Sequence, residues 1–167
     1  MAASATVAAR VAATITSALD LVTAAAPLVK NVEQTFTNGT GANQINQVWS
    51  DTRTLTASAT ENLDLSGALT NAFGASVALT KVKFILVKAA AANTNDVQVG
   101  GAATNGFDSF IGTAGDFVKV KPGGTLMLIA PDATGYAVTA ATGDLLKMTN
   151  GAGSTSVTYD VVIGGVE

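Results

Sequence analysis

The chain has 167 residues, enough for one domain and an additional arm, and it contains neither cysteine nor histidine. The missing cysteine excludes disulfides, thiolate nucleophiles and cysteine-based metal sites, and the missing histidine removes the commonest general base and transition-metal ligand. The chain has a net charge of −3 and only 13% charged residues, so it lacks the basic profile of a nucleic-acid-binding protein. A surface with so few charges indicates that neighbouring molecules cover part of it.

Residues 1–30 form the first unit, and their apolar residues fit two periods. Apolar residues recur every fourth position from Val7 to Leu19, as on a helix face, but every second residue from Val7 to Ile15 is also apolar, as on a strand face. A secretory signal fits poorly, because no positive charge precedes Arg10 and polar residues interrupt the apolar stretch. We expect an N-terminal arm, extended or helical, that packs on a neighbouring subunit or on its own domain. An ordinary first strand of the domain is the alternative.

Residues 31–167 are expected to form one β-sandwich domain. Residues 31–57 predict a hairpin around the glycine-rich turn at residues 38–41. Trp49 on its second strand is interpreted as a core or interface anchor, because one ring without aromatic partners is a poor platform for stacking a sugar. A short strand is expected at residues 61–65. After it, the four-residue spacing of Leu69 and Phe73, followed by Gly74, predicts a short helix.

The densest apolar run, residues 81–88, predicts the central strand of the sandwich. Strict alternation would place Val82, Phe84 and Leu86 on one face, with Ile85 and Val87 on the other. Residues 89–116 follow as a long, glycine-rich excursion, of a length that often makes contacts.

The last third of the chain predicts several further strands separated by turns. Residues 117–121 and 125–130 are expected to pair around a type II turn, in which Pro122 sets φ at the second position and Gly123 takes positive φ at the third. Strands at this spacing, with little helix, are typical of an all-β protein. We expect an antiparallel, jelly-roll-like β-sandwich of about eight strands.

The residues that could carry chemistry do not form a recognisable site. No phosphate-binding loop and no Gly-x-Ser-x-Gly context is present. The acidic residues that could act as a glycosidase pair are Glu61, Asp64, Asp96, Asp108, Asp116, Asp132, Asp144 and Asp160. Asp96, Asp108 or Asp116 could also bind Ca²⁺ together with loop carbonyls. None has a signature spacing, and acidic residues beside turns, such as Asp132 and Asp144, usually cap backbone groups. We therefore predict a protein that is not an enzyme, with no catalytic, cofactor-binding or metal-binding residue.

The lysines of the predicted strands form the remaining charged pattern. They are Lys81, Lys83, Lys119 and Lys121. They could form a basic stripe on one sheet face. In an acidic chain we interpret them instead as edge charges that discourage unwanted strand pairing.

Several turns and strands between roughly residues 50 and 164 resemble a group of small structural proteins of tailed bacteriophages. The resembling stretches are residues 54–61, 120–126, 130–136, 143–146 and 157–164. The resemblance does not cover residues 1–30 and carries over no catalytic or binding residue.

The resemblance implies a virion component without enzymatic activity. The expectation is a capsid decoration (cement) protein that binds the assembled shell as a homo-oligomer, with a trimer favoured, and stabilises it. The expected partner is the major capsid protein or another virion protein, with no nucleic acid and no membrane. The alternative is a tail or head-fibre adaptor, or a carbohydrate-binding module in host recognition.

Overall fold

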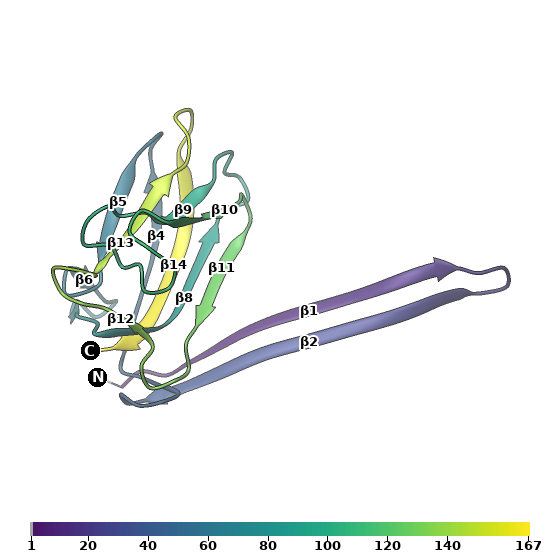
Figure 1. The fold of residues 1–167 in the computed structure, drawn as a ribbon, viewed down its shortest axis with the longest axis horizontal. Coiled ribbons are helices and arrows are strands. Elements are labelled where there is room, and N and C mark those ends of the chain that lie inside the picture. Colours follow the sequence, from purple (N-terminus) through teal and green to yellow (C-terminus); the bar gives the residue numbers. More distant parts are fainter. Residues whose placement is uncertain (1) are drawn as a thin grey trace.

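The computed structural model describes residues 2–167, which fold into strands and turns without a helix (Figure 1). Most of the chain forms a β-sandwich, and the N-terminal strands form a long arm that leaves its lower end. In chain order the strands are β1 (Ala5–Ala18), β2 (Thr23–Asn38), β3 (Gln44–Ile45), β4 (Gln47–Leu55), β5 (Thr60–Asp64), β6 (Leu69–Thr70), β7 (Ser76–Val77), β8 (Lys81–Ala89), β9 (Val97–Gly100), β10 (Phe117–Val120), β11 (Thr125–Ile129), β12 (Tyr136–Ala137), β13 (Leu145–Asn150) and β14 (Val157–Val166).

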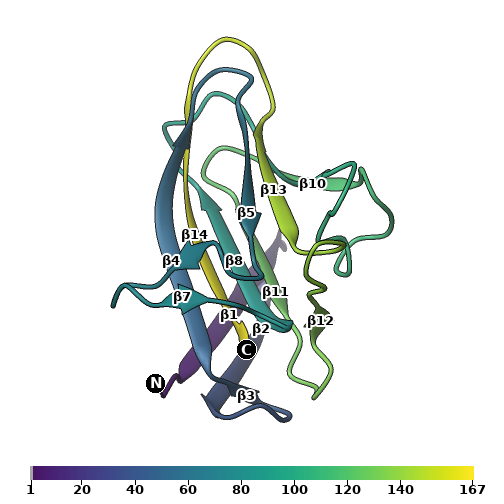
Figure 2. The ribbon, with the colours of Figure 1, turned by 90° about the vertical axis from the view of Figure 1, so that its left-hand side faces the viewer.

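Two antiparallel sheets form the two layers of the sandwich (Figure 2). One has the order β4-β14-β8-β11, with β12 added on β8, and the other has the order β5-β13-β9-β10. Buried side chains from both sheets form one cluster, which we call the main core. It includes Trp49, Leu63, Ile85, Val87, Val99, Leu146, Met148, Tyr159, Val161 and Ile163.

The all-β class is confirmed, but residues 2–167 form fourteen strands in several sheets rather than a single eight-stranded sandwich with a short helix. The short helix expected from Leu69, Phe73 and Gly74 is wrong, because β6 and β7 form a small hairpin there. The Asn71 side chain accepts hydrogen bonds from the backbone N–H groups of Phe73 and Ala75, which favours a tight turn over a helix. Phe73 is 81% exposed.

The strand β8 lies inside its sheet between β11 and β14, as expected for the central strand. Its predicted faces are partly wrong, because the register with β14 shifts between Gly164 and Gly165. Gly164 lies opposite Phe84 and Gly165 lies opposite Val82, so Lys83 is an extra residue on β8. This bulge turns Val82 into the main core, whereas Phe84 faces away from it.

The expected turn at residues 121–124 is present, with Gly123 at φ 71° and the Gly124 N–H donating to the Lys121 carbonyl. The strands beside it do not pair with each other as expected. β10 pairs with β9, whereas β11 pairs with β8 in the other sheet, so the turn carries the chain from one layer to the other.

The arm is a hairpin in which β1 and β2 pair from Ala5↔Phe36 to Ala18↔Thr23. Of the two conformations left open by the sequence, the extended one is therefore present. Fourteen paired residues span roughly 45 Å at the usual rise of a strand. The segment 31–38 belongs to the arm and not to a hairpin of its own, because β2 continues to Asn38 before the chain turns into β3.

Candidate interaction surface

The arm has one mostly apolar face. Residues paired across an antiparallel hairpin share a face, and successive residues alternate between faces. We call the following set the apolar face of the arm: Ala5, Val7, Ala9, Val11, Ala13, Ile15 and Ser17 from β1, with Ala24, Ala26, Leu28, Lys30, Val32, Gln34 and Phe36 from β2. The opposite face mixes Ala and Val with Thr, Arg10, Asn31 and Glu33.

Beyond its base, the apolar face has nothing packed against it. Val11 is 60% exposed, Ile15 is 76% exposed and Leu28 is 60% exposed. At the tip, Leu21 is 93% exposed. A two-stranded ribbon is at best marginally stable alone in water, and large exposed apolar patches mark interaction sites. The arm is therefore the strongest candidate for a functional surface, and the alternating apolar residues from Val7 to Ile15 are its signal in the sequence.

The base of the arm is anchored on the outer face of the β4-β14-β8-β11 sheet. Val7, Phe36, Ile45 and Phe84 form a second buried cluster there, which we call the anchor. The Phe36 and Phe84 rings lie with centroids 5.6 Å apart. Gly164 lies directly opposite Phe84, and a Cβ at this position would overlap the Phe84 ring. The ring therefore occupies the space left by glycine and presents its other side to the arm.

A groove of about 350 Å³ lies where β1 meets the sheet. Its lining comes from Ser4–Ala8 of the arm and from four sheet strands, through Val48, Phe84, Leu86, Met127 and Val162. The groove contains no residue of β2, so it lies on the side of the free β1 edge. Its lining is mostly apolar, with Ser4 and Thr6 as the polar residues, which suits an apolar side chain from another segment.

The two edges of the arm differ in their hydrogen-bonding groups. The Leu19 N–H donates to the Val22 carbonyl, which marks this as a hydrogen-bonded pair. By the alternation of antiparallel ladders, every second pair toward the base is then also a hydrogen-bonded pair. The intervening residues point their N–H and C=O groups outward. On β1 these are the even-numbered residues from Thr6 to Ala18, and none is proline. On β2 they include Pro27, which has no N–H.

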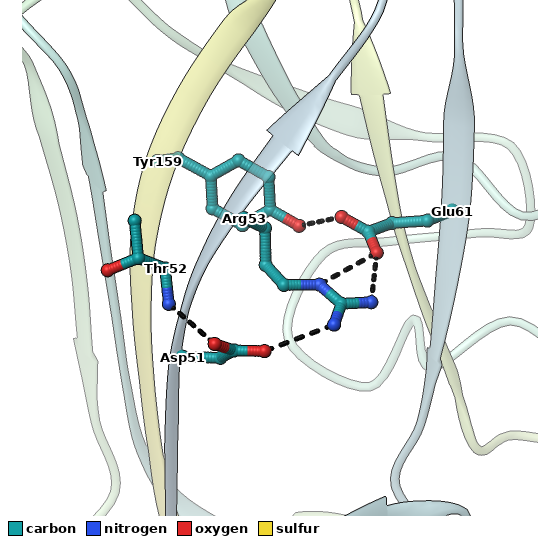
Figure 3. A network of polar contacts seen from close by, with 5 residues as sticks. All are labelled: Asp51, Thr52, Arg53, Glu61 and Tyr159. Carbon is teal, nitrogen blue, oxygen red and sulfur yellow. Dashed lines mark hydrogen bonds and ion pairs between the residues drawn. The ribbon is translucent and has the colours of Figure 1, made fainter.

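A polar network ties the two sheets together at β4 and β5 (Figure 3). Arg53 of β4 donates through both Nε, at 2.9 Å, and Nη2 to the same Glu61 oxygen of β5. Its Nη1 donates to Asp51 at 3.0 Å, and the Tyr159 hydroxyl donates to the other Glu61 oxygen. Glu61 thus accepts hydrogen bonds from two strands of the facing sheet, β4 and β14, which is a stabilising arrangement.

This network shifts two pKa values. The hydrogen bond to Glu61 raises the pKa of Arg53 further above its ordinary value, although burial opposes it. Burial, together with the hydrogen bond to Glu61, raises the pKa of Tyr159 far above the ordinary value of 10.0. Both directions favour the protons that Arg53 and Tyr159 donate to Glu61.

The four lysines form no basic stripe, because they lie in different sheets and have separate partners. The interpretation as edge charges is wrong for Lys81 and Lys83, since β8 lies inside its sheet. Lys83 is fully buried and its ammonium donates to the Asp132 carbonyl, and burial lowers its pKa. Lys81 donates to the Ala133 carbonyl at 3.0 Å, so both lysines hold the loop after β11. Lys121 pairs with Asp96 at 2.8 Å.

Most candidate acidic residues have structural partners. Asp132 caps its own turn through Thr134 and Gly135, and these hydrogen bonds, led by the one from the Thr134 hydroxyl, lower its pKa to about 2. Asp116 accepts from Thr113, and Asp160 accepts from Thr52.

Asp64 and Asp144 are brought together by Ser66, whose hydroxyl lies 2.9 Å and 2.7 Å from their oxygens. Asp144 also accepts from the Ala141 N–H, which fits the expected cap at a turn. Within residues 2–167, no group of three acidic residues is close enough together to hold a metal ion.

Trp49 is 5% exposed and belongs to the main core. The interpretation as a core anchor is therefore confirmed, and its ring is not available as a sugar platform. Tyr159 is fully buried, and Tyr136 packs edge-on against Phe110.

In the part of the chain that the structure describes, no helix is long and apolar enough to cross a membrane. The chain matches no protein-family model, no curated protein and no solved structure.

Proposed function

We propose that this chain is a structural protein without enzymatic activity, and that its arm binds neighbouring subunits in an assembled particle. The observation that carries the proposal is the exposed apolar face, which continues the anchored base of the arm outward without any covering. A monomer gains nothing from such a surface, whereas a subunit in an assembly buries it.

The more specific proposal is a bacteriophage capsid decoration protein that binds the assembled shell as a homo-oligomer and stabilises it. It rests on the resemblance of residues 50–164, on the small sandwich domain and on the arm, whose roughly 45 Å length could cross a boundary between subunits. Many weak contacts repeated over a shell add up to strong attachment, because each bound site raises the effective concentration at the next.

We infer in addition a jelly-roll connectivity for eight of the fourteen strands. β4 pairs with β14, β5 with β13, β8 with β11, and β9 with β10. The first strand of these eight therefore pairs with the last, the second with the seventh, and so on inward. A long hairpin rolled into two sheets has this nested pairing, which is the pattern of a jelly roll.

Co-sedimentation with empty shells of the phage that encodes this chain tests the proposed function. We expect the wild type to pellet with the shells and the Val11→Asp/Ile15→Asp variant to stay in the supernatant, because two charges then interrupt the apolar face. The matched control, Thr14→Asp/Thr16→Asp, places the same charges on the opposite face and is expected to pellet. Equal binding by the Val11→Asp/Ile15→Asp variant, or no binding by the wild type at saturation, would overturn the proposal.

A further inference from the structure

We propose that two copies of this chain pair antiparallel through the β1 edges of their arms, and that the tip of each arm docks in the groove at the base of the other. The inference deepens the proposed function by naming a second copy of the chain as the partner of the arm. Three features support it: the unequal edges of the arm, the self-complementarity of β1, and the matching positions of groove and tip.

The unequal edges select β1. An exposed strand edge is a template for pairing with another chain, and proline blocks such pairing where the N–H is needed. Pro27 lies at an outward-facing position in the middle of β2. The β1 edge has no proline from Thr6 to Ala18 and only one charged side chain, Arg10. It is therefore the edge of the arm that can accept a full-length strand.

The β1 edge is also complementary to itself. Two β1 strands that overlap fully, with outward-facing residues opposite one another, place Thr6 opposite the partner's Ala18 and Ala12 on the two-fold axis. Arg10 then lies opposite the partner's Thr14, so no like charges meet directly. The apolar faces of both arms fall on the same side and merge into one larger face. Residues 2–38 carry two basic and two acidic side chains, so the paired arms have no net side-chain charge.

The same register brings the tip of one arm to the groove of the other. Ser4–Ala8 line the groove, and the partner's Ala18 lies opposite Thr6, so the partner's tip loop passes beside the groove. The tip carries three exposed apolar side chains, Leu19, Leu21 and Val22. The groove offers Leu86 and Met127, which are apolar and partly exposed, beside the buried Phe84. Each copy supplies one tip and one groove, so the pair closes and does not grow into a filament.

Light scattering of the purified full chain tests the pairing. We expect the wild type to have twice the 16.6 kDa mass of one chain. Ala12→Pro removes an outward N–H at the centre of the β1 edge and should yield monomers. Ala25→Pro makes the same change at an outward position of β2 and should leave the dimer intact. A wild type that stays monomeric or forms trimers, or a dimer lost equally in both variants, overturns the proposal.

Cross-linking tests the register without relying on proline. The chain has no cysteine, so Ala12→Cys introduces a single thiol at the proposed two-fold axis. Directly opposed residues of this type lie about 5.5 Å apart at Cα, within the range that a disulfide spans. Mild oxidation should link Ala12→Cys into covalent dimers much faster than Ala25→Cys, which has the same residue on the other edge. Equal rates, or faster linkage of Ala25→Cys, contradict the β1 pairing.

These outcomes separate the pairing from the proposed function. A monomer that still pellets with shells would refute the pairing and keep the shell-binding role. A dimer that shows no affinity for shells would support the pairing and refute that role.

Discussion

At the residue scale, the contact between Gly164 and Phe84 decides how the arm joins the sandwich. The Phe84 ring lies over the position that any larger residue would fill, and its other side packs on Phe36. The bulge at Lys83 contributes as well, because it lets Phe84 face the arm while Val82, two residues earlier, faces the main core. Three adjacent features of the backbone and side chains thus build one docking point for the arm.

Gly164→Ala is expected to lower the free energy of unfolding by about 1–3 kcal/mol, the usual cost of overpacking a filled site. The added methyl group overlaps the Phe84 ring and must displace it from the anchor. Urea unfolding measures the change. The double variant Gly164→Ala/Phe84→Leu should recover part of the loss, because the smaller side chain leaves room for the methyl group. Additive effects of the two substitutions would refute the proposed overlap.

Tyr159 should give the protein a distinctive loss of stability in alkaline solution. Its pKa in the folded chain is raised by burial and by Glu61, whereas in the unfolded chain it is about 10. Above pH 10 the unfolded state releases this proton first, so the contribution of Tyr159 is complete below pH 10 and declines as the pH rises further. Tyr159→Phe should be about 1 kcal/mol less stable at pH 7, through the lost hydrogen bond to Glu61.

Urea unfolding of the wild type and Tyr159→Phe between pH 7 and about pH 11 checks this expectation. The stability difference between them should shrink above pH 10, because only the wild type carries the titrating group. A difference that stays constant over the whole range would show that the Tyr159 pKa is the same in the folded and unfolded states.

At the scale of the elements, the arm and the sandwich have separate cores. The anchor contains Val7, Phe36, Ile45 and Phe84, and none of these belongs to the main core. Regions held by few buried contacts open locally at lower free energy than the rest of a protein. The arm should therefore detach from the sandwich without unfolding it.

Phe36→Ala is expected to separate the two elements. Truncating a buried phenylalanine removes about 3–5 kcal/mol of packing, and here that loss falls on the anchor. Hydrogen exchange should accelerate in β1 and β2 and stay unchanged in β8. The control Phe107→Ala removes an equally buried ring from the main core and should destabilise the sandwich itself. Uniform acceleration in Phe36→Ala would mean that arm and sandwich unfold together.

The sequence predicts some of these elements and not others. The apolar run at residues 81–88 predicts β8, because β-branched and aromatic residues concentrate there. The hairpin of the arm is not evident, because its turn at Leu19–Val22 contains no glycine or asparagine to mark it. The spacing of Leu69 and Phe73 suggests a helix, but the Asn71 side chain binds the backbone locally and produces a turn.

The candidate site could be predicted only in part, since its decisive contacts join distant residues. The alternation from Val7 to Ile15 indicates an extended arm, but not its partner strand or its length. The network of Arg53, Glu61 and Tyr159 joins three strands of two sheets, and no spacing of these residues in the sequence predicts that they meet. Strict alternation places Val82 on the wrong face, because a bulge at Lys83 interrupts the alternation and nothing in the β8 sequence marks this bulge.

At the scale of the whole molecule, the shape indicates that the arm binds another molecule. A compact sandwich carries an arm that it leaves uncovered, with an apolar face, an apolar tip and an open strand edge (Figure 1). Each of these features lowers the solubility of an isolated chain and is useful only when another molecule covers the arm. We therefore expect the arm to be buried in the assembled state.

Hydrogen exchange at the outward-facing β1 amides, the even-numbered residues from Thr6 to Ala18, measures that burial most directly. These N–H groups point away from β2, and no other strand of the described residues pairs with this edge. In dilute protein they should exchange rapidly, and in concentrated or shell-bound protein they should slow by at least about tenfold, the change expected when 1.4 kcal/mol of protection is gained. Rapid exchange of these amides in every state would show that nothing pairs with the β1 edge and would contradict the account.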